Sequence, residues 1–391
     1  MRVAIDARSL NNEHIRGMGR CLWELIARSG ASAQTHWHVL SDRPDLPLHV
    51  PQNAHVTSHL FECRGYRFRT WEQWALPRKA RQLKADLLHC PAGRLPWWQP
   101  VPTIVTLHDT MPWQHDEPMW PRGWYTDWLI PRALHKAAAV ITVSETSKKD
   151  ILRRWPNLEA KLHVIPNGIC DSYHKVNPGP LSPTLQSMGV QSPYFLYVGG
   201  AIERKRPEWA IKVLEQLNDP DVQLVLCGIG RHGQESILRL IPKELQHRVC
   251  IPTFVPEEEM PRLYQNAVAV LYPTLYEGFG LPVVEAHAVG TPILFSEVGS
   301  LTELVGPSAI VLPTNELSAW IDVCRKLLAT RRMHSQPDKS ARSWATRFSW
   351  STFADRNLEV YRYVLSYQKK VNSWQHTLEA EKVTSAPLWF S

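Results

Sequence analysis

Two glutamates separated by seven residues flank a glycine-rich turn in the second half of the chain. The segment EGFGLPVVE runs from Glu277 to Glu285 and follows an apolar, strand-like run. Gly278 and Gly280 permit a tight turn that a ligand can approach closely, and the proline that follows suits the first turn of a helix. Free N–H groups at a helix N-terminus form an anion site suited to a diphosphate. We therefore expect the two carboxylates to hold hydroxyl groups on either side of a diphosphate, although a capped helix start with incidental acids has the same pattern.

A second segment, YVGGAIERKRPEWAI, places a basic run shortly after a glycine pair. Gly199 and Gly200 end an apolar strand pattern and leave room for a ligand against the backbone. Arg204, Lys205 and Arg206 bring the positive charge that a departing diphosphate requires. The alternative is a solvated helix start, which would interact poorly with the helix dipole.

The segment EGFGLPVVE resembles the E-x7-E motif of the retaining glycosyltransferases of family 4, which have the GT-B fold. The resemblance implies that Glu277 contacts the transferred sugar and that Glu285 contacts the ribose of the nucleotide. It also implies that the loop at Phe279, Gly280 and Leu281 holds the sugar and the phosphates.

The same resemblance assigns further donor contacts. The family commonly has an arginine in the glycine turn and a lysine a few residues later, both on the diphosphate. Lys205 matches the lysine, whereas Gly200 stands at the arginine position, so Arg204 is the nearest replacement. The segment TFVPEEEMPRLYQNA is similar to a loop and helix that touch the base, which makes Phe254 and Val255 candidates for that contact.

In the first half, the segment RGMGR resembles a glycine loop that faces the donor phosphates, which implies roles for Gly17, Gly19 and Arg20. His108 follows an apolar strand pattern, where the family has a histidine close to the anomeric carbon. Asp109 is then placed to accept a proton from the acceptor hydroxyl or to orient His108. A lone histidine at a strand end otherwise has a structural role.

A group of tryptophans alternates with basic residues in the same half. Such side chains stack on sugar rings, lie at a membrane interface beside anionic headgroups, or simply fill the core and the loops. The tryptophans are Trp71, Trp74, Trp97, Trp98, Trp113, Trp120, Trp124 and Trp128, and the basic residues are Arg67, Arg69, Arg78, Lys79, Arg94 and Arg122.

Short apolar runs alternate with amphipathic stretches along the chain, which predicts parallel sheets covered by helices on both faces. The expected strands are 3–5, 37–40, 86–89, 103–107, 140–143, 194–198, 223–227, 268–272, 292–295 and 309–312. The proline- and glycine-rich stretch 177–193 interrupts the alternation and reads as a linker.

We therefore predict an α/β protein of the GT-B type, with two Rossmann-like domains facing each other across a cleft. Residues 1–180 form the acceptor-binding domain and residues 181–348 the nucleotide-sugar-binding domain. Residues 349–391 form a helix, about 351–366, that returns to the first domain, followed by a tail. Ligands of such sheets bind beyond the carboxyl ends of the strands.

Composition narrows the partners and the compartment. The 391 residues carry a net charge of +7, and residues 1–190 hold 23 Lys/Arg against 16 Asp/Glu, which favours an anionic partner. No compact basic run of the nucleic-acid type occurs. Seven cysteines are spread singly, which is typical of reduced thiols in a cytoplasm. No signal peptide or spanning segment is expected, so membrane contact would be peripheral, at the inner face.

These features predict a retaining hexosyltransferase that uses a nucleotide-diphosphate sugar, GDP- or UDP-linked, and a glycan or lipid-linked glycan as acceptor. The chain is similar to bacterial mannosyl and hexosyl transferases of surface polysaccharide assembly, which favours mannose. We expect no metal and no other cofactor, because the one Asp-x-Asp triplet, Asp219-Pro220-Asp221, precedes a strand pattern and reads as a turn. The alternatives are a nucleotide-sugar epimerase or hydrolase on the same fold, a non-catalytic glycan-binding protein, and a phosphorylase, for which no cofactor-lysine motif is evident.

Overall fold

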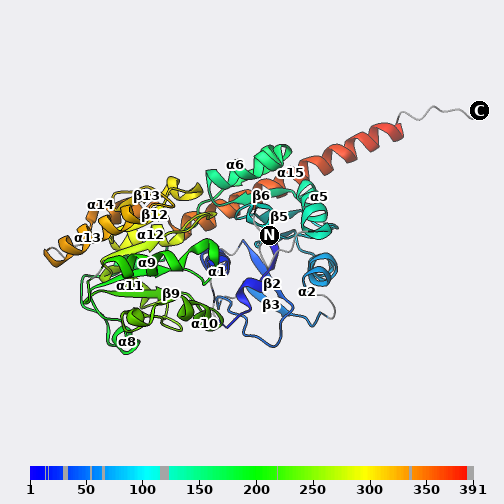
Figure 1. Ribbon diagram of the computed structural model, residues 1–391. Coiled ribbons are helices and arrows are strands. Elements are labelled where there is room, and N and C mark those ends of the chain that lie inside the picture. The colour runs from blue at the N-terminus through cyan, green and yellow to red at the C-terminus, as the bar shows by residue number, and fades with distance from the viewer. Residues whose placement is uncertain are drawn as a thin grey trace, which may run out of the picture. The chain divides into compact units, whose positions relative to one another are not determined.

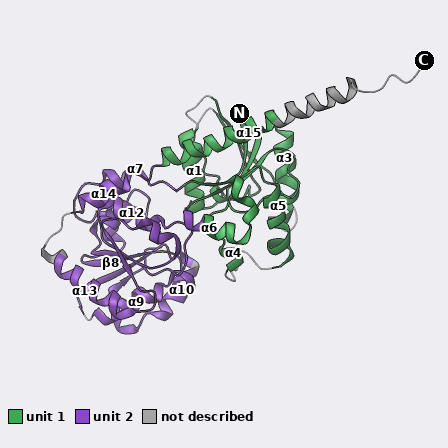
Figure 2. Ribbon diagram, turned by 90° about the horizontal axis from the view of Figure 1, so that it is seen from above, with its two compact units in different colours: residues 1–143, 148–165, 350–391 green, residues 144–147, 166–349 purple. Residues whose placement is uncertain are grey.

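The computed structural model describes residues 1–13, 15, 17–29, 34–52, 55–63, 67–114, 123–217, 219–333 and 337–384 (Figure 1). Arg16, Trp120 and Arg122 of the predicted sites lie outside these residues. The chain forms two compact units, shown in green and purple in Figure 2. Residues 1–143, 148–165 and 350–391 make the first unit, and residues 144–147 and 166–349 make the second.

The first unit is built on a parallel seven-stranded sheet in the order β3-β2-β1-β4-β5-β6-β7. Apolar runs such as Val3–Ile5 and Leu87–Leu88 are buried on both faces, as parallel strands covered by helices require. The strands are β1 (Arg2–Asp6), β2 (His36–Ser41), β3 (Val56–Leu60), β4 (Leu87–Cys90), β5 (Thr103–Thr106), β6 (Ala139–Thr142) and β7 (Leu162–Val164).

Helices follow these strands in the first unit. Two of them are π-helices, η2 and η3, each of which runs directly into an α-helix that has proline at its start. The helices are α1 (Gly17–Ser29), α2 (Arg67–Thr70), η2 (Trp71–Ala75), α3 (Leu76–Gln82), α4 (Met111–Gln114), η3 (Trp124–Leu129), α5 (Ile130–Lys136), α6 (Glu145–Arg154) and α15 (Trp350–Thr384).

The second unit has a parallel six-stranded sheet in the order β10-β9-β8-β11-β12-β13. Its strands are β8 (Tyr194–Val198), β9 (Gln223–Cys227), β10 (Val249–Cys250), β11 (Ala269–Tyr272), β12 (Ile293–Ser296) and β13 (Ala309–Leu312). Its helices are α7 (Asp171–Lys175), α8 (Pro183–Ser187), α9 (Pro207–Leu217), α10 (Arg231–Leu240), α11 (Met260–Asn266), α12 (Leu281–Val289), α13 (Leu317–Met333) and α14 (Lys339–Ala345).

The stretch predicted to be a linker is instead part of the second unit. The side chain of Ser182 caps α8 by accepting a hydrogen bond from the N–H of Leu185 (3.2 Å), and its hydroxyl donates to Glu259 (2.7 Å). Leu181, Leu185 and Val190 are buried. The chain passes from the first unit to the second at residues 165–166, upstream of the predicted boundary at 180, and Gln223 of β9 holds the stretch by accepting from the N–H of Gln191 (2.9 Å) and donating to the carbonyl of Gly189 (3.0 Å).

The last helix, α15, begins in the position expected and continues well beyond residue 366. Its first half packs on α1 and on the sheet of the first unit (Figure 2). The buried hydroxyl of Tyr361 lies 2.6 Å from His89 Nδ1, and its ring meets Trp37 edge-on. Within the described residues, none of the helices is both long and apolar enough to cross a bilayer.

Candidate active site

The two segments predicted to bind a donor lie at neighbouring strand ends of the second unit. Strands β8 and β11 are adjacent, and the chain proceeds from β8 to one side of the sheet and from β11 to the other. Such a switch point is where open parallel sheets bind ligands, beyond the carboxyl ends of the strands. The strand order therefore brings the loop with Lys205, after β8, to the loop with Glu277, after β11.

One carboxylate oxygen of Glu277 is the centre of this site. Its Oε1 atom lies 2.7 Å from Lys205 Nζ, 3.1 Å from Arg204 Nη1 and 2.8 Å from Thr274 Oγ1. Lys205 Nζ also donates to the hydroxyl of Tyr272 (3.2 Å). The three charged side chains are only 12–18% exposed, so they interact in a poorly solvated environment.

The two cations keep this carboxylate ionised. Burial alone would raise the pKa of Glu277, but attraction to Lys205 and Arg204 outweighs it, so the net pKa is lowered. Burial, with the nearby carboxylate, raises the pKa of Tyr272 and of Tyr197, and both therefore remain hydroxyl groups at neutral pH. Two cations face one carboxylate, and the excess positive charge suits an anionic ligand.

The glycine pair after β8 is shaped by Tyr197. The Tyr197 hydroxyl donates to the carbonyls of Gly200 (3.0 Å) and Lys205 (3.3 Å), which fixes the basic loop against the strand end. A Cβ atom on Gly199 would lie 2.7 Å from that hydroxyl, so glycine is required there. A Cβ on Gly200 would meet nothing closer than Ile202, at 3.6 Å, so a side chain fits at the position where the family commonly has arginine.

Hydroxyl groups anchor the turn between Glu277 and α12 through its carbonyls. Ser300 donates to the carbonyls of Glu277 (2.6 Å) and Phe279 (3.1 Å), and Ser144 donates to that of Gly278 (2.7 Å). These hydrogen bonds use the carbonyl groups of the turn, whereas an anion at the start of a helix binds N–H groups. The Phe279 side chain is buried against Phe348, so its contribution to a ligand is limited to the backbone.

Gly280 begins α12 in a left-handed conformation, with a φ of 111°. A Cβ atom there would lie 2.4 Å from the side chain of Leu301, so only glycine fits. Leu281 is the first residue of the nine-residue helix, and a proline follows it, as predicted. The predicted strand, glycine turn and helix are thus confirmed.

Glu285 lies on α12, one turn inside the helix, and is half-buried. The hydroxyl of Tyr264 donates to its Oε2 atom. Burial, followed by the charge of Glu285, raises the pKa of Tyr264 and keeps that donor protonated. In the predicted base-binding loop, the Phe254 side chain is exposed whereas Val255 is buried.

The remaining predicted residues belong to the first unit. His108 follows β5, and its Nε2–H donates to the carbonyl of Pro91 (3.1 Å). Burial lowers the pKa of His108 despite this bond, so the ring is neutral and Nδ1 is its acceptor. Asp109 accepts a hydrogen bond from the N–H of Met111 (2.9 Å) at the start of α4.

Gly17, Gly19 and Arg20 lie in the first turn of α1, after β1. A Cβ atom on Gly19 would lie 2.5 Å from the carbonyl oxygen of Ser9, so glycine is required by close backbone contact, whereas Gly17 is open. Arg20 pairs with Glu24 (3.0 Å), which is one turn further along the helix.

Several side chains that organise the site were not predicted. Thr274 and Tyr272 flank the end of β11 without a recognisable motif. Ser144, which follows β6, caps a helix, since it accepts from the N–H of Ser147 (3.0 Å). Its second role, on the carbonyl of Gly278, spans 134 residues and leaves no local signal.

Comparison with known proteins identifies the family of both halves of the chain. A family model described as glycosyl transferases group 1 matches residues 188–344, and one described as glycosyltransferase family 4 matches residues 15–173. The chain is 28% identical over 309 residues to O-antigen chain mannosyltransferase B of Escherichia coli, covering 74% of this chain and 77% of the relative.

Solved structures share the fold. Sucrose-phosphate synthase from Thermosynechococcus elongatus superimposes with a TM-score of 0.73 at 20% identity, covering 94% of this chain and 99% of the other. The Anabaena protein HepE, solved with UDP and glucose, gives a TM-score of 0.70 at 19% identity, covering 93% and 100%. With matches across both units, the chain belongs to the group 1 and family 4 glycosyltransferases and has the GT-B fold.

Proposed function

We propose that this glycosyltransferase moves a hexose, with mannose favoured, from a nucleotide-diphosphate sugar to a glycan or lipid-linked glycan, with retention of the anomeric configuration. The observation that carries the proposal is the cluster of Lys205, Arg204 and Glu277 beside the start of α12. A half-buried pair of cations next to a helix N-terminus stabilises negative charge on two adjacent phosphates.

The donor is held by groups of the second unit. The diphosphate binds Lys205, Arg204 and the N–H groups at the start of α12. Glu277 accepts a hydroxyl of the sugar, and Glu285 accepts a hydroxyl of the ribose. Gly278, Phe279, Gly280 and Leu281 contribute backbone, and the loop of Phe254 and Val255 lies beside the base.

Transfer breaks the bond between the anomeric carbon and the diphosphate, forms a bond to the acceptor oxygen on the same face, and passes the proton of the acceptor hydroxyl to Asp109. Positive charge from Lys205 and Arg204 supplies the stabilisation that a metal ion provides in other transferases, so the proposed reaction needs no metal. In the first unit, we assign His108 to the sugar and Asp109 to the acceptor hydroxyl. The donor phosphates are assigned to Gly17, Gly19 and Arg20.

The mannose preference rests on the name of the Escherichia coli relative and on its 28% identity. We further propose that the acceptor glycan is carried on a lipid at the inner face of a membrane. The excess of basic residues in the first 190 positions supports an anionic surface of this kind.

A donor panel tests the proposal. We expect GDP-mannose to stabilise the folded protein against heat and to be consumed only when a glycan acceptor is present, with the product in the anomeric configuration of the donor. The rate in EDTA should be within about twofold of the rate without it, because side chains stabilise the negative charge on the leaving group. Donor turnover without an acceptor would contradict the transfer reaction. An inverted product would contradict retention, and a steep loss of rate in EDTA would contradict independence of metal.

A further inference from the structure

The first unit carries a patch of exposed tryptophans and basic residues on η2, α3, η3, α5 and the loop after β4. Its five indoles are 38–60% exposed, although tryptophan is usually well buried. We name the tryptophan patch by its members, Trp74, Trp97, Trp98, Trp124 and Trp128 with Arg78, Arg81, Arg132 and Lys136.

Ring contacts make the patch continuous. Trp124 stacks on Trp128 (5.5 Å between ring centroids), and Trp128 stacks on Trp97 (6.2 Å). The guanidinium of Arg78 lies over both Trp74 (4.5 Å) and Trp98 (5.8 Å), and Trp98 is bonded to Trp97 in sequence. Arg81 of α3 also lies over the ring of Trp98 (6.0 Å), and Lys136 of α5 lies over that of Trp97.

The same short motif builds both ends of the patch. Trp74-Ala-Leu-Pro-Arg78 and Trp128-Leu-Ile-Pro-Arg132 share the pattern W-x-x-P-R, and each spans the junction of a π-helix with an α-helix. In each, the arginine donates to the carbonyl of the tryptophan four residues earlier (3.3 Å) and covers its ring, at 4.5 and 4.1 Å. π-Helical turns often mark functional positions.

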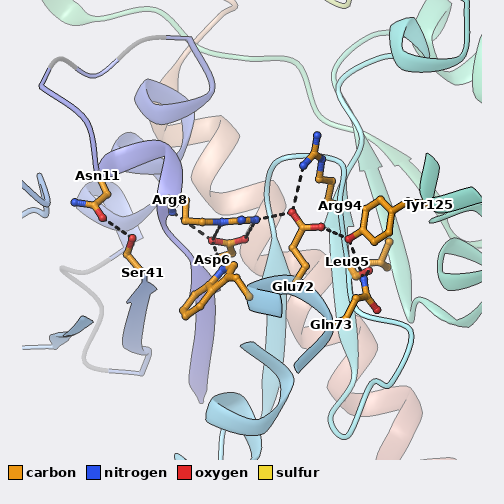
Figure 3. A network of polar contacts seen from close by, with 10 residues as sticks. Asp6, Arg8, Asn11, Ser41, Glu72, Gln73, Arg94, Leu95 and Tyr125 are labelled. Carbon is orange, nitrogen blue, oxygen red and sulfur yellow. Dashed lines mark hydrogen bonds and ion pairs between the residues drawn. The ribbon is translucent and has the colours of Figure 1, made fainter. Parts of the chain in front are cut away.

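A buried polar network holds these elements in place (Figure 3). Within η2, Glu72 is fully buried while Trp74 is exposed. One oxygen of Glu72 lies 2.7 Å from Arg8 Nη2 and 3.6 Å from Arg94 Nη1, and the other accepts from the hydroxyl of Tyr125 in η3. Burial, reinforced by Glu72, raises the pKa of Tyr125, so it stays a donor.

Gln73 extends this network to the third tryptophan-bearing segment. Its amide nitrogen lies 3.1 Å from the Tyr125 hydroxyl and donates to the carbonyl of Leu95 (3.2 Å). Its amide oxygen accepts from the N–H of Trp97 (2.8 Å). The surface indoles are therefore fixed by buried partners on η2, on η3 and on the loop after β4, so that ligand binding orders few side chains.

Charge on the patch is strongly one-sided. Among residues 71–82, 96–99 and 124–136, Asp127 is the one exposed carboxylate, and it accepts from the N–H of Gly123 (2.9 Å). No described carboxylate forms an ion pair with Arg78, Arg81, Arg132 or Lys136, so these four positive charges are available to an anionic ligand.

The faces of the indole rings distinguish between a sugar and a membrane. A sugar stacks on an open aromatic face, but Lys136 lies 3.4 Å from the ring centroid of Trp97, and arginines cover Trp74 and Trp128. A cation therefore already occupies a face of each of these three rings, which leaves less open face for a sugar to stack on. Indoles at the headgroup level with basic residues beside them are the arrangement that binds an anionic lipid surface.

We propose that the tryptophan patch is a docking surface for an anionic membrane, with the indole edges entering the headgroup layer and the four cations facing lipid phosphates. The inference deepens the proposed function, on whose lipid-linked acceptor it rests for its biological purpose. Its physical content, binding to lipid, is measured independently of sugar transfer.

Co-sedimentation of the full chain with vesicles tests the surface. We expect binding to phosphatidylglycerol mixed with phosphatidylethanolamine and much weaker binding to phosphatidylcholine alone. Arg132→Gln should weaken binding to the anionic vesicles about fivefold, the effect of one basic residue near a charged bilayer. Trp74→Ala combined with Trp128→Ala should weaken it about tenfold.

The matched controls lie on α10 of the second unit, where Leu240 is 51% exposed and Arg239 is exposed beside it. Leu240→Ala and Arg239→Gln should bind vesicles like the unchanged protein. Equal binding by patch and control variants, or no preference for anionic vesicles, would overturn the inference.

Two further measurements separate the alternatives. A soluble oligosaccharide that displaces the protein from vesicles, or that binds the unchanged protein but not the patch variants, would identify a glycan site instead. Patch variants should keep the thermal stabilisation by GDP-mannose. If GDP-mannose did not stabilise even the unchanged protein, that result would count against the proposed function but would leave the membrane-binding result unaffected.

Discussion

Glu277→Gln is expected to lower the rate of sugar transfer about 10²- to 10³-fold while the protein remains folded. The carboxylate is the centre of the cluster, and interactions aimed at developing charge in a poorly solvated site are typically of this size. Glutamine keeps the shape and an acceptor oxygen for Lys205 and Thr274, so the variant isolates the loss of charge. Transfer rates at saturating donor with a glycan acceptor measure the expected loss of activity. The melting temperature shows whether the variant remains folded.

The choice of glutamine matters because Glu277→Ala would leave the two half-buried cations without their carboxylate. Breaking a buried ion pair from one side costs about 3–5 kcal/mol of stability, and lost activity would then be ambiguous. Glu208→Gln is the matched control, since Glu208 pairs with Arg206 (3.8 Å) in the same basic segment but is more exposed. Undiminished transfer by Glu277→Gln would remove the central assignment.

Lys205→Ala is expected to weaken binding of a nucleoside diphosphate about 10- to 100-fold and to leave the acceptor KM nearly unchanged. A charge-assisted hydrogen bond contributes about 1.5–3 kcal/mol, and Lys205 Nζ is one of the two cations beside the turn. Titration calorimetry with GDP and UDP measures the first effect, and acceptor-dependent kinetics measure the second.

Lys212→Ala on α9 is the control for Lys205, because it removes an exposed lysine from the helix that follows the basic loop. It should bind both nucleotides normally. If Lys205→Ala behaved like this control, or if it affected the acceptor as strongly as the donor, Lys205 would not be a diphosphate ligand.

Local pattern predicted most of the sheet residues. The expected ranges for β8, β9 and β13 match the observed strands, and β12 differs by one residue at each end. The strands not predicted, β3, β7 and β10, lie at sheet edges, and the last two have three and two residues. Such segments are too short or too polar to show an apolar period.

The misassigned linker has a different cause. Prolines and glycines indicate that residues 177–193 form no long helix or strand, and the structure has the five-residue α8 there, but they do not indicate which part of the fold the segment packs on. The segment is held in the second unit by the buried Leu181 and Leu185 and by the hydrogen bonds of Gln223 to residues 189 and 191, and such contacts are not encoded in local composition. Ser182, which bonds to Glu259 77 residues away, belongs to the same class of information.

At the site, the glycine turn, the start of α12 and the basic loop were predictable because each has a local chemical reason. Their convergence on one oxygen of Glu277 was not, since it depends on the order of β8 and β11 in the sheet. The tryptophan group divides in the same way. Trp71 and Trp113 are core residues, the five members of the patch are exposed, and only the fold distinguishes them.

The most direct test of the account is a structure of the protein with a bound nucleotide-diphosphate sugar. The account predicts phosphate oxygens within hydrogen-bonding distance of Lys205 Nζ and of the first N–H groups of α12, with Glu277 on a sugar hydroxyl and Glu285 on the ribose. A nucleotide bound elsewhere, with Glu277 still engaged only by Lys205, Arg204 and Thr274, would contradict it.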